Sequence, residues 1–250
     1  MNFFADYSLM QWLAILLASA ITGMGKAGLR GVDMLSVTLM AFVFGSKSST
    51  GIVLPLLCMA DIAAVWYYHR HAQWSHFRKL VPWMVVGILL GVWLGKDMNE
   101  MVFRKLMASI ILFTILIVLF MEYRKPSNVP HHPLFVSSTG LAAGFTTMIG
   151  NLAGAFSNLY FLAMRMPKND FIGTASWIFL CMNLFKLPFQ VFFWKNITAH
   201  SLSVDLVLLP TLAIGFWIGL RIVGKIKEEQ YRKLVILLTL AGSLLMLLKR

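Results

Sequence analysis

Residues 9–28 read LMQWLAILLASAITGMGKAG, a largely apolar run that ends in three glycines and a lysine. The glycines have the spacing G-x-G-x-x-G, which in soluble proteins marks a dinucleotide-binding loop. That loop needs a strand before it and an acidic residue about 20 residues after it. Here a membrane-helix pattern precedes the glycines, and Asp33 follows only five residues after Gly28. We therefore interpret the stretch as a break at the end of a membrane helix.

The composition supports a membrane protein. The 250 residues are 59% hydrophobic and 13% charged, and the mean hydropathy is +0.76. Soluble domains are about 45–50% apolar and about 25% charged. The net charge of +12 fits Lys and Arg at cytoplasmic helix ends beside anionic lipid, and no basic soluble domain exists to bind nucleic acid. We predict an all-α, multi-pass membrane protein.

Apolar segments of spanning or near-spanning length follow one another along the chain. They cover residues 9–24, 33–45, 51–68, 80–95, 103–121, 134–149, 153–166, 171–194, 203–223 and 231–248. Segments 33–45 and 153–166 are too short for a bilayer core of about 30 Å, and each directly follows a glycine-rich break. We expect about eight to ten transmembrane or broken helices, with these two as parts of broken or re-entrant elements.

Lys and Arg set the expected orientation, because they gather in the cytoplasmic loops of membrane proteins. Polar stretches that contain them occupy residues 69–79, 122–133 and 221–233. With these stretches in the cytoplasm and all ten segments crossing, 14 Lys and Arg lie on that side and seven on the other. Both termini are then periplasmic. If the two short segments are re-entrant, each half has an even number of crossings and the repeats are parallel.

The two halves of the chain resemble each other. ITGMGKAGLRGVDML (21–35) aligns with TTMIGNLAGAFSNLY (146–160), and a second pair of stretches aligns residues 45–68 with 166–190. Apolar stretches look alike by chance, but the ordered recurrence of glycine break, short helix and intramembrane polar residue favours duplication. Five crossings per half predict inverted repeats, as in many secondary transporters. The expected divisions are a first repeat, a linker and a second repeat over 1–125, 126–133 and 134–250.

The break at 23–28 has the composition of an anion site. Glycine lets helices approach closely and lets the backbone unwind, and unwound backbone exposes amide N–H groups. Lys26 and Arg30 add positive charge, which is costly in a bilayer unless it faces a cavity, a partner or a ligand. The plainer alternative is a cytoplasmic turn with packing glycines. The second copy, IGNLAG (149–154), favours a site at which the two breaks meet.

Polar residues inside the apolar segments extend this candidate site. Asp61 lies ten residues after Gly51, as Asn183 lies ten residues after Gly173, and an intramembrane carboxylate is a functional hypothesis by default. Asp61 either carries a coupling proton or neutralises a nearby lysine. Lys186 shares a helix face with Asn183. It either pairs with Asp61 across the repeat interface or extends toward the membrane surface.

Lys47 and Ser48 precede Gly51 in a polar cluster at the expected start of a helix, where hydroxyls and free amides suit an oxyanion. A small anion is therefore the expected substrate. The predicted substrate-binding residues are Gly23, Gly25, Lys26, Gly28, Arg30, Lys47, Ser48, Gly150, Asn151, Gly154 and Asn183, with Asp61 and Lys186 for proton coupling or ion pairing.

The sequence carries no pattern for catalysis, metal binding or a cofactor. A nucleophile elbow, paired catalytic carboxylates and H-E-x-x-H are missing. His69, His71 and His76 lack the Cys or carboxylate that would complete a zinc site, and we expect them at the lipid interface. Cys58 and Cys181 are expected to be small apolar fillers, a thiol relay being the alternative.

These stretches resemble the TauE/SafE sulfite-exporter-like permeases, small bacterial membrane transporters with two duplicated halves. The resemblance covers essentially the whole chain. It is strongest where Leu-Pro-x(5)-Asp is followed by Tyr-Tyr-x-Arg, within STGIVLPLLCMADIAAVWYYHR (49–70). It also rests on TGMGKAGLRG (22–31), GFTTMIGNLAG (144–154) and GTASWIFLCMNL (173–184). Lys26 and Ala27 depart from the family's G-x-G-G-G pattern, and an extra cation should alter the preferred size or charge of the anion.

The resemblance implies proton-coupled export of a sulfur-containing anion such as sulfite or an organosulfonate. We therefore expect a secondary transporter of the bacterial inner membrane whose partners are its small anion and the lipid bilayer, with a homo-oligomer left open. The alternatives are a passive anion channel on the same fold and, from another class, a membrane-embedded thiol-handling enzyme or assembly factor. By position the resemblance points to Gly23, Gly25, Lys26, Pro55 and Asp61, and to Gly150, Gly154 and Asn183 in the second half.

Overall fold

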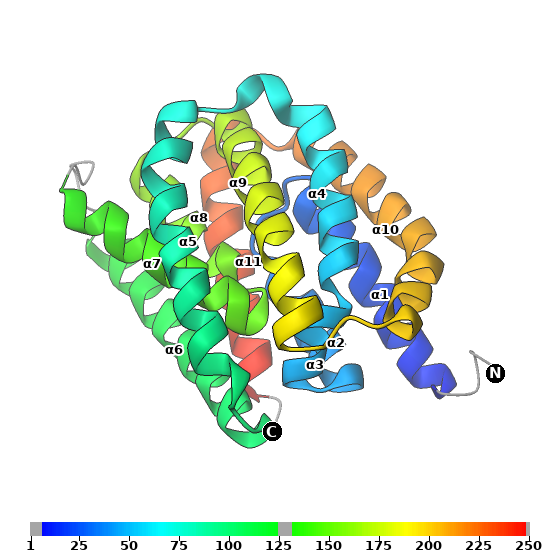
Figure 1. The fold of residues 1–250 in the computed structure, drawn as a ribbon. Helices are drawn as coiled ribbons and strands as arrows, with labels where there is room; N and C mark the ends of the chain where they lie inside the picture. The colour runs from blue at the N-terminus through cyan, green and yellow to red at the C-terminus, as the bar shows by residue number, and fades with distance from the viewer. Residues whose placement is uncertain (1–6, 125–131, 249–250) are drawn as a thin grey trace.

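The computed structural model describes residues 7–124 and 132–248, and every regular element there is a helix (Figure 1). Each of the ten predicted apolar segments coincides with a helix or a pair of helices, so the predicted all-α fold is confirmed. The predicted linker 126–133 lies outside the described residues except for its last two positions. The elements are α1 (Leu9–Lys26), α2 (Asp33–Phe44), α3 (Ser46–Ile52), α4 (Leu54–Tyr68), η2 (His69–His71), α5 (Trp74–Lys96), α6 (Glu100–Arg124), α7 (Pro133–Gly150), α8 (Ala153–Ala163), α9 (Lys168–Pro188), η3 (Phe189–Phe193), α10 (Ala199–Lys225) and α11 (Glu228–Leu248).

Two helices at the centre, α4 and α9, contact each other across the middle of the molecule. The pair α1 and α10 packs on one flank of them, and the pair α5 and α7 packs on the other (Figure 1). Both ends of the described chain lie at the lower edge in Figure 1, while η2 lies at the upper edge. The short helices α2 and α8 are packed against α11 and α6, respectively.

The two predicted breaks are present. After α1 ends at Lys26, the chain turns through residues 27–32, where Gly28 and Gly31 have φ of 121° and 104°. Side chains rarely adopt that left-handed region, which glycine enters freely. After α7 ends at Gly150, Asn151 takes the left-handed conformation with φ of 55°, which asparagine tolerates better than most residues. Each break reverses the chain into a short helix.

Glycine also lets the flanking helices come close. A Cβ at Gly23 of α1 would overlap the carbonyl oxygen of Leu212 in α10, and a Cβ at Gly87 of α5 would overlap that of Leu141 in α7. If α7 is the counterpart of α1, and α10 is the counterpart of α5, then the contact of α1 with α10 matches the contact of α7 with α5. The packing is what inverted repeats would produce, and the duplication itself stays a prediction.

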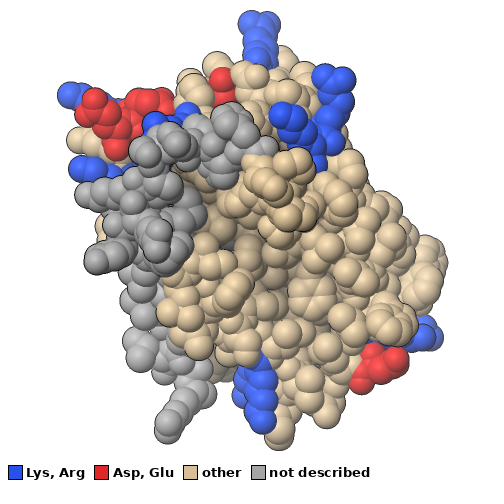
Figure 2. Space-filling view, turned by 90° about the vertical axis from the view of Figure 1, so that its left-hand side faces the viewer, with Lys and Arg blue, Asp and Glu red and all other residues tan. Residues whose placement is uncertain are grey.

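A band of apolar side chains surrounds the helices. Figure 2 shows Lys and Arg at the upper and lower edges of one face, with a band free of them between. Large apolar side chains are exposed on the outer faces, such as Trp66 at 80% and Trp93 at 74%. Within the described residues, four helices are long and apolar enough to cross a membrane, and the pair α3 and α4, bent by 46°, would make a fifth. A multi-pass membrane protein follows from this surface.

Candidate functional site

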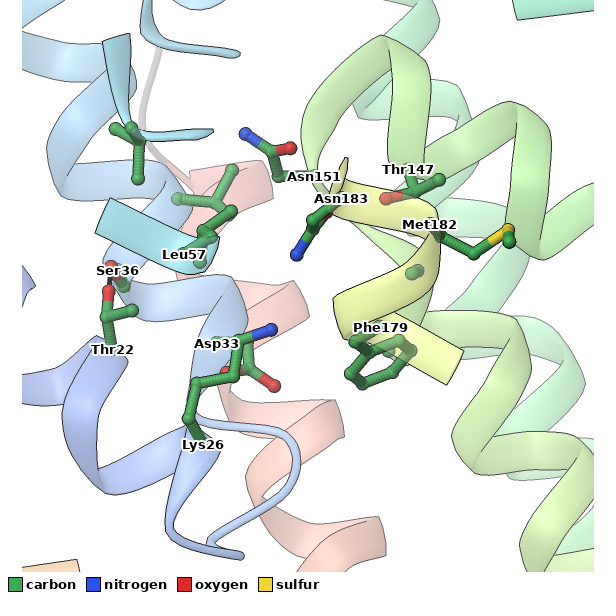
Figure 3. A pocket seen from close by; sticks show the side chains of 14 residues that line it. Thr22, Lys26, Asp33, Ser36, Leu57, Thr147, Asn151, Phe179, Met182 and Asn183 are labelled. Carbon is green, nitrogen blue, oxygen red and sulfur yellow. Dashed lines mark hydrogen bonds between the residues drawn. The ribbon is translucent and has the colours of Figure 1, made fainter. Parts of the chain in front are cut away.

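A narrow polar pocket lies between the helices of the two predicted repeats (Figure 3). Side chains from α1, α2 and α4 line one side, and side chains from α7, α8 and α9 line the other. The space has room for about two water molecules. Its polar lining residues are Thr22, Lys26, Asp33, Ser36, Thr147, Asn151 and Asn183. A pocket with this lining can hold a small polar group, and its inner space is narrow in this structure.

Lys26 and Asp61 form a buried ion pair beside this pocket. The Lys26 Nζ lies 2.7 Å from Asp61 Oδ1, and the two side chains are 7% and 0% exposed. Asp61 Oδ1 accepts no hydrogen bond with good geometry, so its attraction to the Lys26 ammonium is that of two opposite charges in contact. Asn183 donates from Nδ2 to Asp61 Oδ2 at 2.6 Å. Asp61 is therefore held by Lys26 from the same predicted repeat and by Asn183, its counterpart in the second predicted repeat.

Lys186 does not pair with Asp61, and it does not extend to the membrane surface. Its side chain is 1% exposed. The ammonium donates to the carbonyl oxygen and to Oγ1 of Thr147 at 3.0 Å each, and to Asn151 Oδ1 at 2.7 Å. Asn151 in turn donates to the carbonyl oxygen of Thr50 at 3.0 Å. The break at the end of α7 supplies these acceptors, so Lys186 ties α9 to that break.

Asp33 lines the pocket although no sequence pattern singled it out. A Cβ at Gly25 would overlap Asp33 Oδ1, and a Cβ at Gly154 would lie 3.6 Å from Asp33 Oδ2. The carboxylate therefore sits between the glycines of the two breaks, and at Gly25 only the missing side chain leaves room for it. The signal was present in the repeat alignment, which places Asp33 opposite Asn158 as it places Asp61 opposite Asn183.

The predicted amide site in the first break is corrected by the structure. Gly23, Gly25 and Lys26 are still helical, and the unwound part is 27–32. The amides of residues 27–30 donate to backbone carbonyls of residues 23–28 within the turn. Because these amides are already bonded, an anion here would be held by side chains. Gly28 serves packing, since a Cβ would come within 2.7 Å of Ile172 Cδ1.

Lys47 and Ser48 lie away from the pocket. The Lys47 ammonium donates to the carbonyl oxygens of Lys96 and Met98 at 2.7 and 2.8 Å. Ser48 lines a different cavity, at the end where α10 begins. Lys47, predicted to belong to an oxyanion site, therefore caps the end of α5. The bend between α3 and α4 directs α3 away from the central pocket.

The second break contributes its asparagine and one of its two glycines to the pocket. Asn151 and Gly154 line the pocket. Gly150 packs between Met107 and Leu152 side chains. Arg30 is fully buried next to the pocket-lining Phe179, with Cζ 5.0 Å from the ring centroid. The structure thus brings together Lys26, Asp61, Asn183, Asn151 and Lys186, with Arg30 behind them.

Cysteines and histidines are the other reactive side chains, and Cys58 lies one helical turn before Asp61 in α4. Cys58 and Cys181 are free thiols. Within residues 7–124 and 132–248, no three His, Cys, Asp or Glu residues gather in a way that could hold a metal ion. His76 contacts the Tyr160 hydroxyl at 2.8 Å, and His71 lies 3.6 Å from Asp170. Among the charged side chains buried in the described residues, Lys26, Arg30, Asp61 and Lys186 lie at or beside the central pocket, and Asp205 belongs to α10.

An apolar outer band and a buried, charged pocket between helices define a multi-pass membrane protein with an internal polar site. The sequence matches the family described as Sulfite exporter TauE/SafE over residues 12–246. The chain belongs to this family of membrane transporters, and the predicted resemblance is confirmed. Neither curated proteins nor solved structures gave a match.

Proposed function

We propose that this protein is a secondary transporter that exports a small sulfur-containing anion, such as sulfite or an organosulfonate, across the bacterial inner membrane together with a proton. The observation that carries the proposal is the buried ion pair of Lys26 and Asp61 beside the pocket. A lysine at this depth requires a negative partner. A substrate anion can take that role in place of the carboxylate.

Competition for Lys26 gives a coupling mechanism. In this structure Asp61 is the counter-ion of Lys26. Removing one partner of a buried pair leaves an uncompensated charge and is strongly unfavourable. An anion that replaces Asp61 at Lys26 would leave the carboxylate unpaired unless Asp61 takes up a proton. The anion and the proton then bind together and move in the same direction, and export follows from a higher anion concentration inside.

The charges near the pocket favour an anion over a cation. Lys26, Arg30 and Lys186 are three cations, whereas Asp33 and Asp61 are two carboxylates. These five groups carry one formal positive charge when all are ionised. The apolar wall formed by Phe179 and Met182 suits the organic part of a sulfonate.

Transport requires the pocket to open and close. Its present space holds about two water molecules, which is less than an organosulfonate needs. Toward the end with α3, the bridge from Lys186 through Asn151 to Thr50 closes the path. An alternating-access cycle would break this bridge on one side while the other side stays shut.

Reconstituted liposomes test the proposal. We expect an imposed proton gradient to drive uphill uptake of radiolabelled sulfite or a sulfonate by the wild-type protein. The Lys26→Gln and Asp61→Asn variants should lose this uphill uptake, whereas Lys225→Gln, at an exposed lysine, should keep it. Uptake of both anions like wild type by the first two variants would contradict the mechanism. Anion flux that never runs uphill would identify the passive channel instead.

A further inference from the structure

Arg30 has donors that nothing in the described structure uses. The side chain is fully buried. Its Nη2 contacts the Ile172 carbonyl oxygen at 3.5 Å and the Ser176 hydroxyl at 3.3 Å, which are long contacts. Nε and Nη1 have no hydrogen-bond partner. No carboxylate within residues 7–124 and 132–248 forms an ion pair with the guanidinium.

Unused donors on a buried guanidinium call for an occupant. Buried polar groups in proteins are almost always hydrogen-bonded, because leaving one unpaired forfeits its hydration without replacement. A guanidinium presents its N–H groups as a planar fork that matches the oxygens of an oxyanion two at a time. The free Nε and Nη1 of Arg30 are available for such a contact.

Phe179 connects Arg30 with the central pocket. Its ring centroid lies 4.8 Å from Lys26 Nζ and 5.0 Å from Arg30 Cζ, so the two cations are within about 10 Å of each other. Phe179 lines the pocket, as Figure 3 shows beside Lys26, whereas Arg30 does not line it. One aromatic side chain therefore contacts both cations, at the boundary of the pocket.

The backbone around Arg30 is fixed by two tyrosines. The Tyr68 hydroxyl donates to the Ala27 carbonyl oxygen at 2.9 Å, and the Tyr231 hydroxyl donates to that of Gly28 at 2.7 Å. These bonds tie Ala27 and Gly28 to α4 and α11, on the side of the pocket toward η2. Because the loop is anchored, rotation of the Phe179 side chain is the smaller change that would join Arg30 to the pocket.

We propose that Arg30 is a second, transient binding site for a sulfur oxyanion, reached from Lys26 when the Phe179 ring rotates away. The inference rests on the proposed function, because it places a second step on the same path. In this structure the Phe179 ring separates the site at Lys26 from the site at Arg30. Arg30 then accepts the anion on the side toward η2 before its release or after its entry.

A cysteine beside the guanidinium tests the site directly. Ser176→Cys would be introduced with Cys58→Ser and Cys181→Ser, and labelled during turnover with two methanethiosulfonates, one bearing a sulfonate and one bearing an ammonium. We expect the sulfonate reagent to react faster by roughly tenfold or more, because a buried cation concentrates anions near it. Adding Arg30→Gln should abolish this preference, whereas Arg70→Gln, at an exposed arginine of η2, should preserve it.

Equal labelling by the two reagents with Arg30 in place would overturn the proposal, as would a failure of both reagents to react. In liposomes, Arg30→Gln should slow sulfite transport by about tenfold or more. The apparent affinity for sulfite, measured as the concentration that gives half of the maximal increase in Tm, should change by less than about threefold. If Arg30→Gln folds poorly, Arg30→Lys keeps the charge without the fork and should show an intermediate rate. Wild-type rates in both variants would refute the second site.

The two proposals fail separately. If Lys26→Gln retains uphill transport, the proposed coupling through Lys26 is wrong, and if the wild-type protein moves neither sulfite nor a sulfonate, the proposed function is wrong. If Lys26→Gln stops transport while Arg30→Gln transports like wild type, the central site stands and Arg30 is structural. Phe179→Ala should speed anion exchange across the liposome membrane, and an unchanged exchange rate would count against the role of the ring.

Discussion

The Lys26 ammonium lies 2.7 Å from Asp61 Oδ1, and the other oxygen of the same carboxylate accepts a hydrogen bond from Asn183. The contact joins the two predicted repeats at one carboxylate. The first repeat supplies both charges, and the second supplies an amide at the matching position. Such an amide can hold either a carboxylate or, by its carbonyl, a protonated acid, so the second repeat can accept both protonation states of Asp61.

Breaking the Lys26–Asp61 pair should destabilise the protein more than removing it entirely. Asp61→Asn leaves a buried ammonium without its counter-ion, and losses of about 3–5 kcal/mol are typical when one partner of such a pair is removed. The double variant Lys26→Met with Asp61→Leu should recover most of that loss without transport activity. The free energy of unfolding in mixed micelles measures the stability of the single and the double variant. A double variant as unstable as the sum of the two single changes would show that the charges are not partners.

Proton uptake should accompany anion binding. If the substrate displaces Asp61 from Lys26, about one proton should be taken up for each anion bound. A pH indicator in weakly buffered detergent solution would report it when sulfonate is added. Asp61→Asn should still bind the anion, because Lys26 is then free of its internal competitor, but without proton uptake. Proton uptake that persists in Asp61→Asn would assign the coupling to another group.

Much of the fold could be predicted from the sequence, because membrane helices are determined by long apolar runs and their interruptions by glycine. The two breaks and the short helices after them were located this way. The limits of the break were wrong by several residues. Gly23 and Gly25 look like the unwound part, but they are helical, and their missing side chains leave room for the Leu212 carbonyl oxygen and the Asp33 carboxylate. Composition does not distinguish a glycine that unwinds from one that packs.

The site was harder to predict, because partners in it are far apart in sequence. Asp61 was identified as an intramembrane charge, but Lys26 and Lys186 are both plausible partners until the helices are placed. The Lys186 ammonium donates its hydrogen bonds to Thr147 and Asn151 at the second break. Lys26 is therefore the lysine that pairs with Asp61. Lys47 has the right residue type near the right glycine, yet the bend between α3 and α4 points it elsewhere.

Gly25 should be more sensitive than Gly154 to the addition of a methyl group. A Cβ at Gly25 would overlap the Asp33 carboxylate, whereas a Cβ at Gly154 would meet it only at 3.6 Å, an ordinary contact. We expect Gly25→Ala to reduce the initial transport rate by roughly tenfold or more, since small displacements in a site have large effects on rate. Gly154→Ala should stay within about threefold of wild type.

Relief of the overlap provides the control. Asp33→Ala in the Gly25→Ala background removes the overlap and leaves only a close contact of the new methyl group with Val32 Cγ2 at 3.2 Å. The double variant should therefore regain most of the folded yield and Tm of Asp33→Ala alone. If the two changes instead reduce stability independently, the contact between Gly25 and Asp33 is not the cause.

Lys186 and Asn151 should be energetically coupled. The Lys186 ammonium donates to Asn151 Oδ1 at 2.7 Å, and both side chains belong to the bridge that reaches Thr50. Hydrogen bonds to charged groups contribute about 1.5–3 kcal/mol, and contacting residues couple by about 0.5–3 kcal/mol. A double-mutant cycle with Lys186→Met and Asn151→Ala, read out as free energy of unfolding, should give a coupling in that range. Additive effects would mean that the bridge contributes nothing.

Two glycines of α10 should respond to alanine with opposite signs. A Cβ at Gly215 would overlap the backbone carbonyl of Ala20 in α1, whereas nothing lies within 4 Å of a Cβ at Gly224. Gly215→Ala must push α1 and α10 apart, and overpacking typically costs about 1–3 kcal/mol. Gly224→Ala meets no neighbour and should stabilise the helix by about 0.5–1 kcal/mol. Thermal unfolding should therefore show a lower Tm for the first variant and an equal or higher Tm for the second. A similar Tm change in both would contradict the close contact of these helices.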